Sequence, residues 1–256
     1  SLIAQLEAVE SLLAQGFQPK RTIYFAFGHD EETGGRNGAR LIAAELKRRK
    51  VQALFGLDEG GAITQGMIDG IARPVAMLMT AEKGYASFEL RLQTDGGHSS
   101  MPPRATAIGR MARAVSRLER QRMSPRLVEP VSQMLSTLAP ELPPLQRLAV
   151  ANLWLFEPLL LQLLADAPAT NALVRTTTAP TLFQAGVADN ALPSEARAVV
   201  NFRLLPGDRV DALLAHIRRV IDDPQISIDA ATADEASVPP PTGSPAWGSP
   251  RPPGGA

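Results

Sequence analysis

The sequence predicts an α/β fold built from two differently organised parts. Over roughly the first 80 residues, helical segments alternate with short, mostly apolar strand-like segments, which is typical of a buried parallel sheet. From residue 81, apolar and polar residues alternate along the strand-like segments, which indicates an antiparallel sheet with one face in water. A Leu- and Pro-rich insertion of roughly 123–172 interrupts this second part. We therefore expect part of an α/β domain, followed by an α+β domain that carries a helical insertion.

The first part is predicted to run helix, strand, helix, strand. Residues 2–15 carry apolar side chains at helical spacing, and Gly16 ends this helix. The segment "RTIYFAFG" then indicates a short strand, "GARLIAAELKRRK" a second helix and "VQALFGL" a second strand. In such sheets, ligands bind where the strands end. The acidic clusters "HDEE" and "DEGG" follow the two strands directly, so we expect them at a binding site.

The second part is predicted to run strand, helix, strand, strand, helix, strand. Its strands are "KGYASFELRLQT", "TTAPTLFQAG", "SEARAVVNFRLLPG" and "QISIDA", and its helices are "AIGRMARAVSRLER" and "RVDALLAHIRRVI". This order predicts a small antiparallel sheet with helices on one face. The insertion, which includes "NLWLFEPLLLQLLAD", is interpreted as a helical subdomain. The last 19 residues contain seven prolines and four glycines, too many for a helix or a strand.

Composition excludes several classes of protein. Lys+Arg and Asp+Glu are equal at 26 each in the 256 residues, so the chain has no net field that would attract nucleic acid or an anionic membrane. Cysteine is absent, which excludes disulfides and thiolate metal sites and leaves carboxylates and the three histidines as possible ligands. No run of 18 apolar residues occurs. The chain has no initiator methionine, so we expect its natural N-terminus to lie upstream.

The run Asp30-Glu31-Glu32 has two interpretations. Consecutive carboxylates are most often a solvated helix start, because they favour the positive end of the helix dipole. Here the run ends a predicted buried strand, glycines follow at once, and a second acidic pair, Asp58-Glu59, repeats the arrangement. Two converging carboxylate clusters repel each other unless a divalent cation lies between them. Adjacent carboxylates also allow one to bind the metal while its neighbour acts as general base.

Five motifs, taken in order, resemble a known family. They are "FAFGHDEETGGRNGA", "LDEGGAI", "TDGGHSSMPP", "NLWLFEP" and "NALPSEARAVVNFRLLPGD". Together they resemble the zinc exopeptidases that include carboxypeptidase S, its N-acyl-amino-acid hydrolase relative, aminoacylase and glutamate carboxypeptidase, with the carboxypeptidase S branch the most similar. The resemblance covers the chain from residue 1 to about 247. It implies a catalytic α/β domain with a pair of zinc ions, interrupted by a lid domain that also forms a homodimer.

The resemblance implies roles for the acidic residues. Glu31 is similar to the general base that takes a proton from the water between the two metals. Glu32 resembles a ligand of one zinc ion. Asp58 and Glu59 both lie in the segment that supplies a ligand of the second zinc. One of these two is expected to bind the metal while the other orients it, and the choice between them stays open.

Three residues of the second part match substrate-site positions of the family. His98, in "GGHSS", resembles the lid histidine that reaches into the partner subunit's site and stabilises the oxyanion of the tetrahedral intermediate. Asn190 and Arg203 resemble substrate-binding residues, and the planar fork of arginine suits a terminal carboxylate. Without the family pattern, His98 would be interpreted as a turn residue and Arg203 as a surface residue. His29 and His216 are interpreted as structural.

The chain departs from the family pattern at both ends. Relatives have a His-x-Asp motif and a metal-bridging aspartate before the first helix, and a histidine ligand near the C-terminus, and these motifs are missing here. Catalytic zinc needs about three protein ligands. We therefore expect a fragment that does not hold a competent pair of zinc ions. Its expected domains are catalytic segments at 1–80 and 232–256, and a lid and dimerisation domain at 81–231.

The residues and the resemblance together predict a metal-dependent hydrolase. Its expected substrate is a peptide or an N-acyl amino acid, cleaved by zinc-activated water at an amide bond next to a free carboxylate. The alternative is a catalytically inactive dimerisation or binding protein on the same fold. A third possibility, an acidic calcium-binding surface, leaves His98 and Arg203 unexplained. No nucleic-acid partner is expected.

Overall fold

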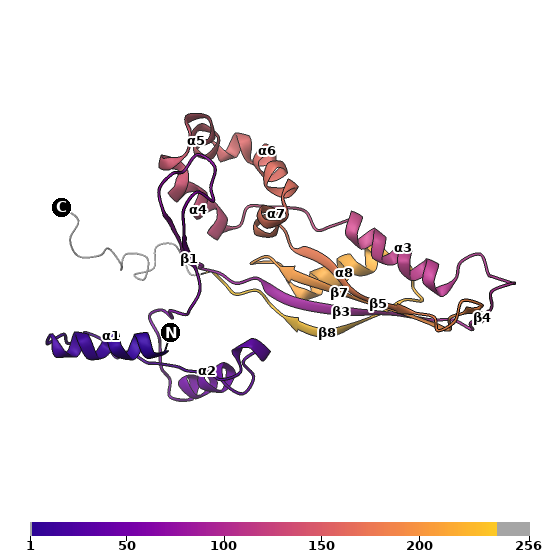
Figure 1. Cartoon of the computed structure of the whole chain (residues 1–256), viewed down its shortest axis with the longest axis horizontal. Coiled ribbons are helices and arrows are strands. Elements are labelled where there is room, and N and C mark those ends of the chain that lie inside the picture. Colours follow the sequence, from indigo (N-terminus) through magenta and orange to yellow (C-terminus); the bar gives the residue numbers. More distant parts are fainter. Residues whose placement is uncertain (1, 240–256) are drawn as a thin grey trace. The chain divides into compact units, whose positions relative to one another are not determined.

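The computed structural model describes residues 2–239, whose helices and strands are drawn in Figure 1. These residues belong to two compact units, 2–60 and 61–239, and each is described by itself. The domain boundaries expected from the sequence stay predictions. The irregular tail was predicted for 238–256, of which all but the first two residues lie outside the described part.

The first unit contains two α-helices and a short 3₁₀ helix, and no strand is found among residues 2–60. Its elements are α1 (Leu2–Ala14), the short 3₁₀ helix η1 (Glu31–Thr33) and α2 (Ala39–Arg48). Both helices predicted for this part are therefore confirmed. The two strands predicted at 21–28 and 51–57 are wrong, because both segments run as chain without a ladder of hydrogen bonds.

The apolar side chains of those two segments explain the error. Phe25, Phe27 and Leu57 have the composition of a buried strand, yet their side chains are exposed. A segment becomes a strand only when neighbouring strands satisfy its N–H and C=O groups. Since residues 2–60 include no such neighbour, the two segments have strand composition without strand pairing. The predicted parallel sheet is accordingly absent from the described first unit.

The second unit is built on a four-stranded antiparallel sheet. In spatial order its strands are β5 (Thr177–Ala185), β7 (Glu195–Leu204), β3 (Gly84–Gln93) and β8 (Ser227–Asp234). Helices α3 (Ala107–Arg120) and α8 (Val210–Ile221) cover one face of this sheet (Figure 1). The predicted order of strand, helix, strand, strand, helix, strand is confirmed, as is the placement of both helices on one face.

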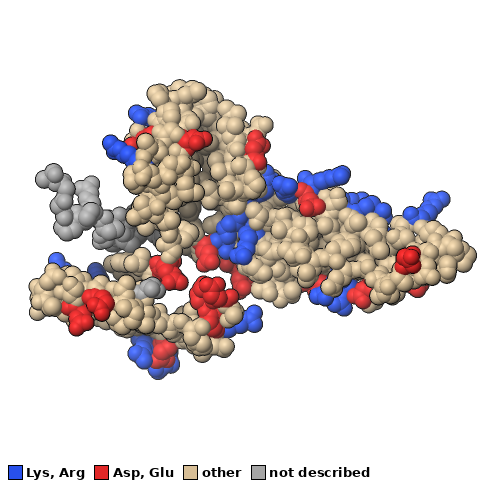
Figure 2. Space-filling view, viewed as in Figure 1, with Lys and Arg blue, Asp and Glu red and all other residues tan. Residues whose placement is uncertain are grey.

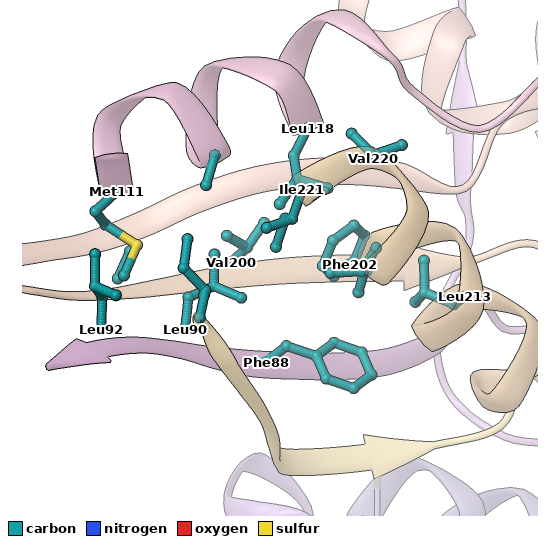
Figure 3. Packing of buried hydrophobic residues seen from close by; sticks show 14 of the residues in the cluster. Phe88, Leu90, Leu92, Met111, Leu118, Val200, Phe202, Leu213, Val220 and Ile221 are labelled. Atoms are coloured by element: carbon teal, nitrogen blue, oxygen red, sulfur yellow. The ribbon is translucent and has the colours of Figure 1, made fainter. Parts of the chain in front are cut away.

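Alternate residues of the two central strands form the core between sheet and helices. Phe88 of β3 and Phe202 of β7 meet edge to face, with ring centroids 5.9 Å apart (Figure 3). Met111 and Leu118 of α3 and Leu213 of α8 belong to the same core and are fully buried, with Met111 lying beside Leu92 of β3 (Figure 3). Each such side chain contributes about 1.5–3 kcal/mol of burial free energy. The intervening residues of β3 and β7 lie on the opposite, open face of the sheet.

The start of α3 depends on a side-chain cap. Thr106 precedes the helix in an extended conformation, and its hydroxyl oxygen accepts a hydrogen bond from the N–H of Gly109 at 3.1 Å. We expect Thr106→Ala to lower the free energy of unfolding by about 1 kcal/mol. Thr106→Ser, which keeps the oxygen, serves as the control and should change it little. Urea unfolding followed by circular dichroism measures both, and equal losses in the two variants would contradict the capping role.

The insertion is helical, as predicted. Its helices are α4 (Glu129–Leu138), η2 (Ala139–Glu141), α5 (Pro144–Ala151), α6 (Leu153–Asp166) and α7 (Pro168–Val174). A small apolar cluster joins it to the end of the sheet and consists of Val128, Val131, Val174 and Leu205. No single helix within residues 2–239 is long and apolar enough to cross a membrane, and α5 and α6 meet that test only as a pair bent by 116°.

The second unit also contains two small antiparallel pairs of strands. β1 (Ala62–Thr64) pairs with β2 (Val75–Met77), and β4 (Gly97–His98) pairs with β6 (Ala191–Leu192). β4 lies at the end of the long sheet that is remote from the helical insertion (Figure 1). This short pair therefore forms a tip at one end of the second unit.

Candidate functional site

Asp30 shapes the loop that presents the first acidic cluster. Its carbonyl accepts hydrogen bonds from the N–H groups of Thr33 at 3.1 Å and Gly35 at 2.8 Å. Its carboxylate Oδ2 accepts from the N–H of Asn37 at 2.7 Å. The two predicted site residues Glu31 and Glu32 lie on the turn closed by these bonds, and their side chains are exposed. This role of Asp30 was not predicted, although an aspartate before a glycine-containing turn is a recognisable signal.

The first unit contains carboxylate oxygens that could bind a metal ion. Asp30 Oδ1 is buried without a hydrogen-bond partner, and a Cβ on Gly38 would lie 2.5 Å from it. Carboxylates of this kind suit a divalent cation in their chemistry. However, residues 2–239 contain no group of three His, Cys, Asp or Glu side chains arranged to hold a metal ion. The donors in residues 2–239 are therefore of the chemical type that binds a divalent cation, but too few of them lie together to hold one.

The second acidic pair is Asp58-Glu59, after the second segment that was predicted as a strand. Asp58 and Glu59 are both exposed, and the N–H of Glu59 donates to Asp58 Oδ1 at 2.8 Å. Both acidic clusters were predicted to converge at the edge of one parallel sheet. That sheet is not formed by residues 2–60, and the two clusters do not combine into a metal-binding group there. The metal roles of Glu32, Asp58 and Glu59 stay predictions.

The structure brings His98 and Asn190 together at the tip of the second unit. His98 on β4 pairs with Ala191 on β6, and the next N–H along, that of Ser99, donates to the carbonyl of Asn190 at 3.1 Å. These two predicted site residues are therefore close in space although they are far apart in the sequence. The histidine side chain is exposed.

Ser100 determines which nitrogen of His98 carries a proton. The backbone N–H of Ser100 donates to His98 Nδ1 at 3.2 Å, and its hydroxyl lies 2.9 Å from the same nitrogen. Because a backbone N–H can only donate, Nδ1 must accept, which places the ring proton on Nε2. An exposed Nε2–H is a hydrogen-bond donor of the kind that an oxyanion requires. Ser100 thus orients the imidazole of His98, a contact that sequence reasoning did not single out.

Arg203 lies on the open face of the sheet, where most other charges are paired. Glu89 accepts from Arg91 at 2.5 Å and from Arg197 at 2.6 Å, and basic and acidic side chains are interspersed on the face of the second unit shown in Figure 2. Arg203 is exposed and forms no ion pair within residues 2–239. Its guanidinium instead stacks on the ring of Tyr85, 4.6 Å from the centroid. The group is held in place yet able to accept an anion.

Arg203 is far from the tip that carries His98 and Asn190. It is near the end of β7, whereas Asn190 precedes the start of that strand. At the usual rise along a strand, the path from Glu195 to Arg203 is roughly 27 Å long. A small substrate does not span this distance. One copy of the second unit therefore does not present Arg203, His98 and Asn190 to the same ligand.

Lys83 lies beside Arg203 and is half-buried. Its ammonium donates to the carbonyls of Ala172 and Arg175, both at 2.8 Å. Loss of hydration on burial, and then the nearby charge of Arg203, lower the pKa of Lys83 to about 8, while Asp208 acts in the opposite direction.

The lowered pKa of Lys83 predicts a stability that rises with pH. The unfolded chain, with an ordinary lysine pKa, binds more protons than the folded chain once the pH passes about 8. The free energy of unfolding should therefore increase from about pH 8 toward the ordinary lysine pKa of about 10.4. Urea unfolding at pH 7.5, 8.5 and 9.5 measures this rise, with Lys47→Met as a surface control that retains it. An identical rise in Lys83→Met would show that another group is responsible.

Comparison with known proteins gives consistent matches. Residues 80–229 match a family model described as a peptidase dimerisation domain. The chain is 44% identical over 230 residues to the probable carboxypeptidase S-like 2 of Dictyostelium discoideum, covering 89% of the chain and 44% of that protein. It is 43% identical over 229 residues to an N-fatty-acyl-amino acid synthase/hydrolase of Xenopus tropicalis, with coverages of 89% and 44%. Carboxypeptidase S of Saccharomyces cerevisiae is 33% identical over 214 residues, covering 79% of the chain and 36% of that protein.

A solved structure extends the likeness to the fold. The aminopeptidase PepT of Bacillus cereus matches with a TM-score of 0.52 and 17% identity, over 93% of this chain and 47% of that one. At this identity the match concerns the fold alone. The chain spans less than half the length of the curated relatives named above.

Proposed function

Because the chain belongs to the M20 peptidase family, in the branch of carboxypeptidase S and the N-acyl amino acid hydrolases, we propose that it is part of a metal-dependent amide hydrolase. The bond cleaved lies next to a free carboxylate, in a peptide or an N-acyl amino acid. The domain boundaries expected from the sequence, 1–80, 81–231 and 232–256, belong to the same proposal.

The observation that carries the substrate assignment is the state of Arg203. Its guanidinium is exposed, has no ion pair among residues 2–239 and is oriented by Tyr85. A planar fork of donors in this state suits a carboxylate that arrives with the substrate. Asn190, which lies beside His98, contributes a second polar contact to the substrate from another copy of the second unit in this proposal.

The acidic residues divide the remaining tasks. Glu31 takes the proton from the attacking water and afterwards delivers it to the leaving amine. Glu32 and one of Asp58 and Glu59 hold metal, for which we propose a pair of zinc ions in a protein extended to the length of its relatives. Zinc supplies Lewis acidity to such a site when bound. Because the described donors do not complete a metal site, we assign no step to the metal itself.

His98 completes the proposal from a second subunit. Its Nε2–H donates to the oxyanion of the tetrahedral intermediate, a contact of the kind typically worth about 3 kcal/mol of barrier. Since His98 and Arg203 lie at opposite ends of the sheet, a substrate touched by both requires two copies of the second unit. The match of residues 80–229 to a dimerisation domain supports a homodimer as the source of the second copy.

The alternative function is a catalytically inactive dimerisation or binding protein on the same fold. The observation in its favour is that residues 2–239 include no complete metal-binding group, whereas the region matched to the dimerisation domain is well formed. The retained carboxylates Glu31 and Glu32 and the orienting bonds of His98 favour the hydrolase.

Zinc binding and hydrolysis test the proposal. We expect the 256-residue chain to bind fewer than two zinc ions tightly in a calorimetric titration, and to hydrolyse no N-acyl amino acid. A version extended to the length of its relatives should bind both ions and cleave N-acyl amino acids. Its rate should fall steeply when the substrate carboxylate is replaced by a carboxamide. An extended, zinc-loaded protein that is inactive on both substrates would favour the alternative function.

A further inference from the structure

Lys83 is a feature of the second unit that the proposed function does not use. The chain has four lysines, at positions 20, 47, 50 and 83, so every other cation of the second unit is an arginine. The ammonium of Lys83 donates to the carbonyls of Ala172 and Arg175, which lie in the last turn of α7 and directly after it. These two bonds join the start of β3 to the end of the helical insertion. The residues that they link are 89 and 92 positions apart in the sequence.

The strand register places Arg203 between the two segments that Lys83 joins. Arg203 on β7 pairs with Tyr85 on β3 and with Thr177 on β5. Tyr85 comes two residues after Lys83, and Thr177 comes two residues after Arg175. Residues two apart on an extended chain project from the same face. Tyr85, Arg203 and Thr177 lie side by side across the three strands. The bond from Lys83 to the carbonyl of Arg175 therefore links β3 to the start of β5 two residues before this set, on the same face of the sheet.

Other hydrogen bonds fix the same segment to the core of the second unit. The carbonyl of Val174 accepts from the N–H of Arg126 at 2.8 Å, and the hydroxyl of Thr176 accepts from the N–H of Leu205, also at 2.8 Å. Val174 and Thr176 are completely buried. These contacts hold the end of the insertion against the core. Lys83 adds a link from this segment to the start of β3.

The position of Lys83 has a cost. A half-buried ammonium beside the guanidinium of Arg203 loses hydration and meets a like charge, and both effects lower its pKa as described above. An apolar side chain of the same length would avoid this cost but could not donate to two carbonyls. The bonds to α7 are thus what the lysine adds at this position.

We propose that Lys83 is a positioning residue for Arg203. By binding the end of α7, it fixes β3 and β5 on either side of Arg203 and keeps the guanidinium stacked on Tyr85. The consequence for substrate binding rests on the proposed function, in which Arg203 receives the carboxylate. The positioning itself is independent of that function and is measurable in the chain without substrate.

The small number of tyrosines makes the stack directly observable. The chain has two tyrosines, Tyr24 and Tyr85, so Tyr24→Phe leaves the ring under Arg203 as the sole tyrosine signal in ¹³C-tyrosine NMR spectra. In this background, Lys83→Met is expected to shift the Tyr85 ring signals most of the way toward their positions in Arg203→Met. Lys83→Arg, which can still donate to both carbonyls, should restore at least half of the shift.

The matched control is another cation that binds a helix end. Arg117 donates to the carbonyl of Ile221 at the end of α8 at 2.6 Å, on the helical face of the sheet. Arg117→Met removes a bond of the same kind and should leave the Tyr85 signals in place. Unchanged Tyr85 signals in Lys83→Met, or equal shifts in Lys83→Met and Arg117→Met, would overturn the proposal.

Two further measurements keep the test decisive. If Lys83→Met does not fold, ¹³C-lysine labelling of the parent chain resolves its four lysines, and absence of a nuclear Overhauser contact between Lys83 and α7 would overturn the link. The role of Arg203 is tested separately in the extended protein. Arg203→Lys with an unchanged KM for N-acyl amino acids would contradict the substrate assignment while leaving the positioning by Lys83 intact.

Discussion

Glu31→Gln, in a zinc-loaded protein extended to the length of its relatives, is expected to lower kcat by about 10²–10⁴-fold and to change KM little. The amide keeps the size of the side chain but cannot take a proton from water. Because Glu31 lies exposed on the turn that Asp30 closes, the substitution should not disturb the loop. Initial rates on an N-acyl amino acid, measured across a range of pH, provide the test.

Zinc content separates the base from its neighbouring ligand. Glu31→Gln should retain the full complement of zinc, whereas Glu32→Gln should lose zinc affinity together with activity. Glu10→Gln, on the exposed surface of α1, is the matched control and should behave as the parent. If Glu31→Gln loses zinc to the same extent as Glu32→Gln, Glu31 is a ligand and the proposed division of roles is wrong.

The second unit was predictable because its strands, and the helices that pack on them, all lie within the given sequence. The alternation along β3 and β7 places Phe88 and Phe202 on the face that α3 and α8 cover, so local pattern and tertiary packing agree. The first unit was not predictable in the same way. The apolar segment around Phe25 has the composition of a strand between two neighbours, and residues 2–60 do not include those neighbours. Pattern alone indicates what a segment can become, and pairing partners decide whether it does.

The side-chain contacts of the candidate site were also only partly predictable from the sequence. Motifs identified His98 and Asn190, but their contact depends on the pairing of β4 with β6, which no local pattern reports. Lys83 was missed because its significance comes from carbonyls about 90 positions away. Asp30 was seen as one charge of an acidic run, although its main contacts are hydrogen bonds from backbone N–H groups. The pairing of distant strands, and hydrogen bonds to backbone carbonyls, could therefore not be predicted from the local sequence pattern.

In the extended, zinc-loaded protein, mixing two inactive variants is expected to restore activity if His98 acts across the dimer. His98→Ala alone should lower kcat by about 10²–10³-fold, as for other oxyanion donors. In a mixed dimer with Glu31→Gln, one site receives an intact Glu31 from the first chain and an intact His98 from the second. The other site receives neither. With random exchange half of the dimers are mixed, so about a quarter of the parent activity should return in a homodimer with two equivalent sites.

If His98 acts within its own chain, the same experiment gives a different amount of restored activity. If His98 served the site of its own chain, both sites of a mixed dimer would lack one group, and mixing would restore nothing. The distance between the tip and Arg203 is the structural reason to expect restoration, since roughly 27 Å of β7 separates the two ends. Dimers exchanged in mild denaturant and assayed after its removal provide the measurement, with parent and Glu31→Gln mixed in the same way as the control. In that control half of all sites keep Glu31, so about half of the parent activity should remain whether His98 acts within or across chains.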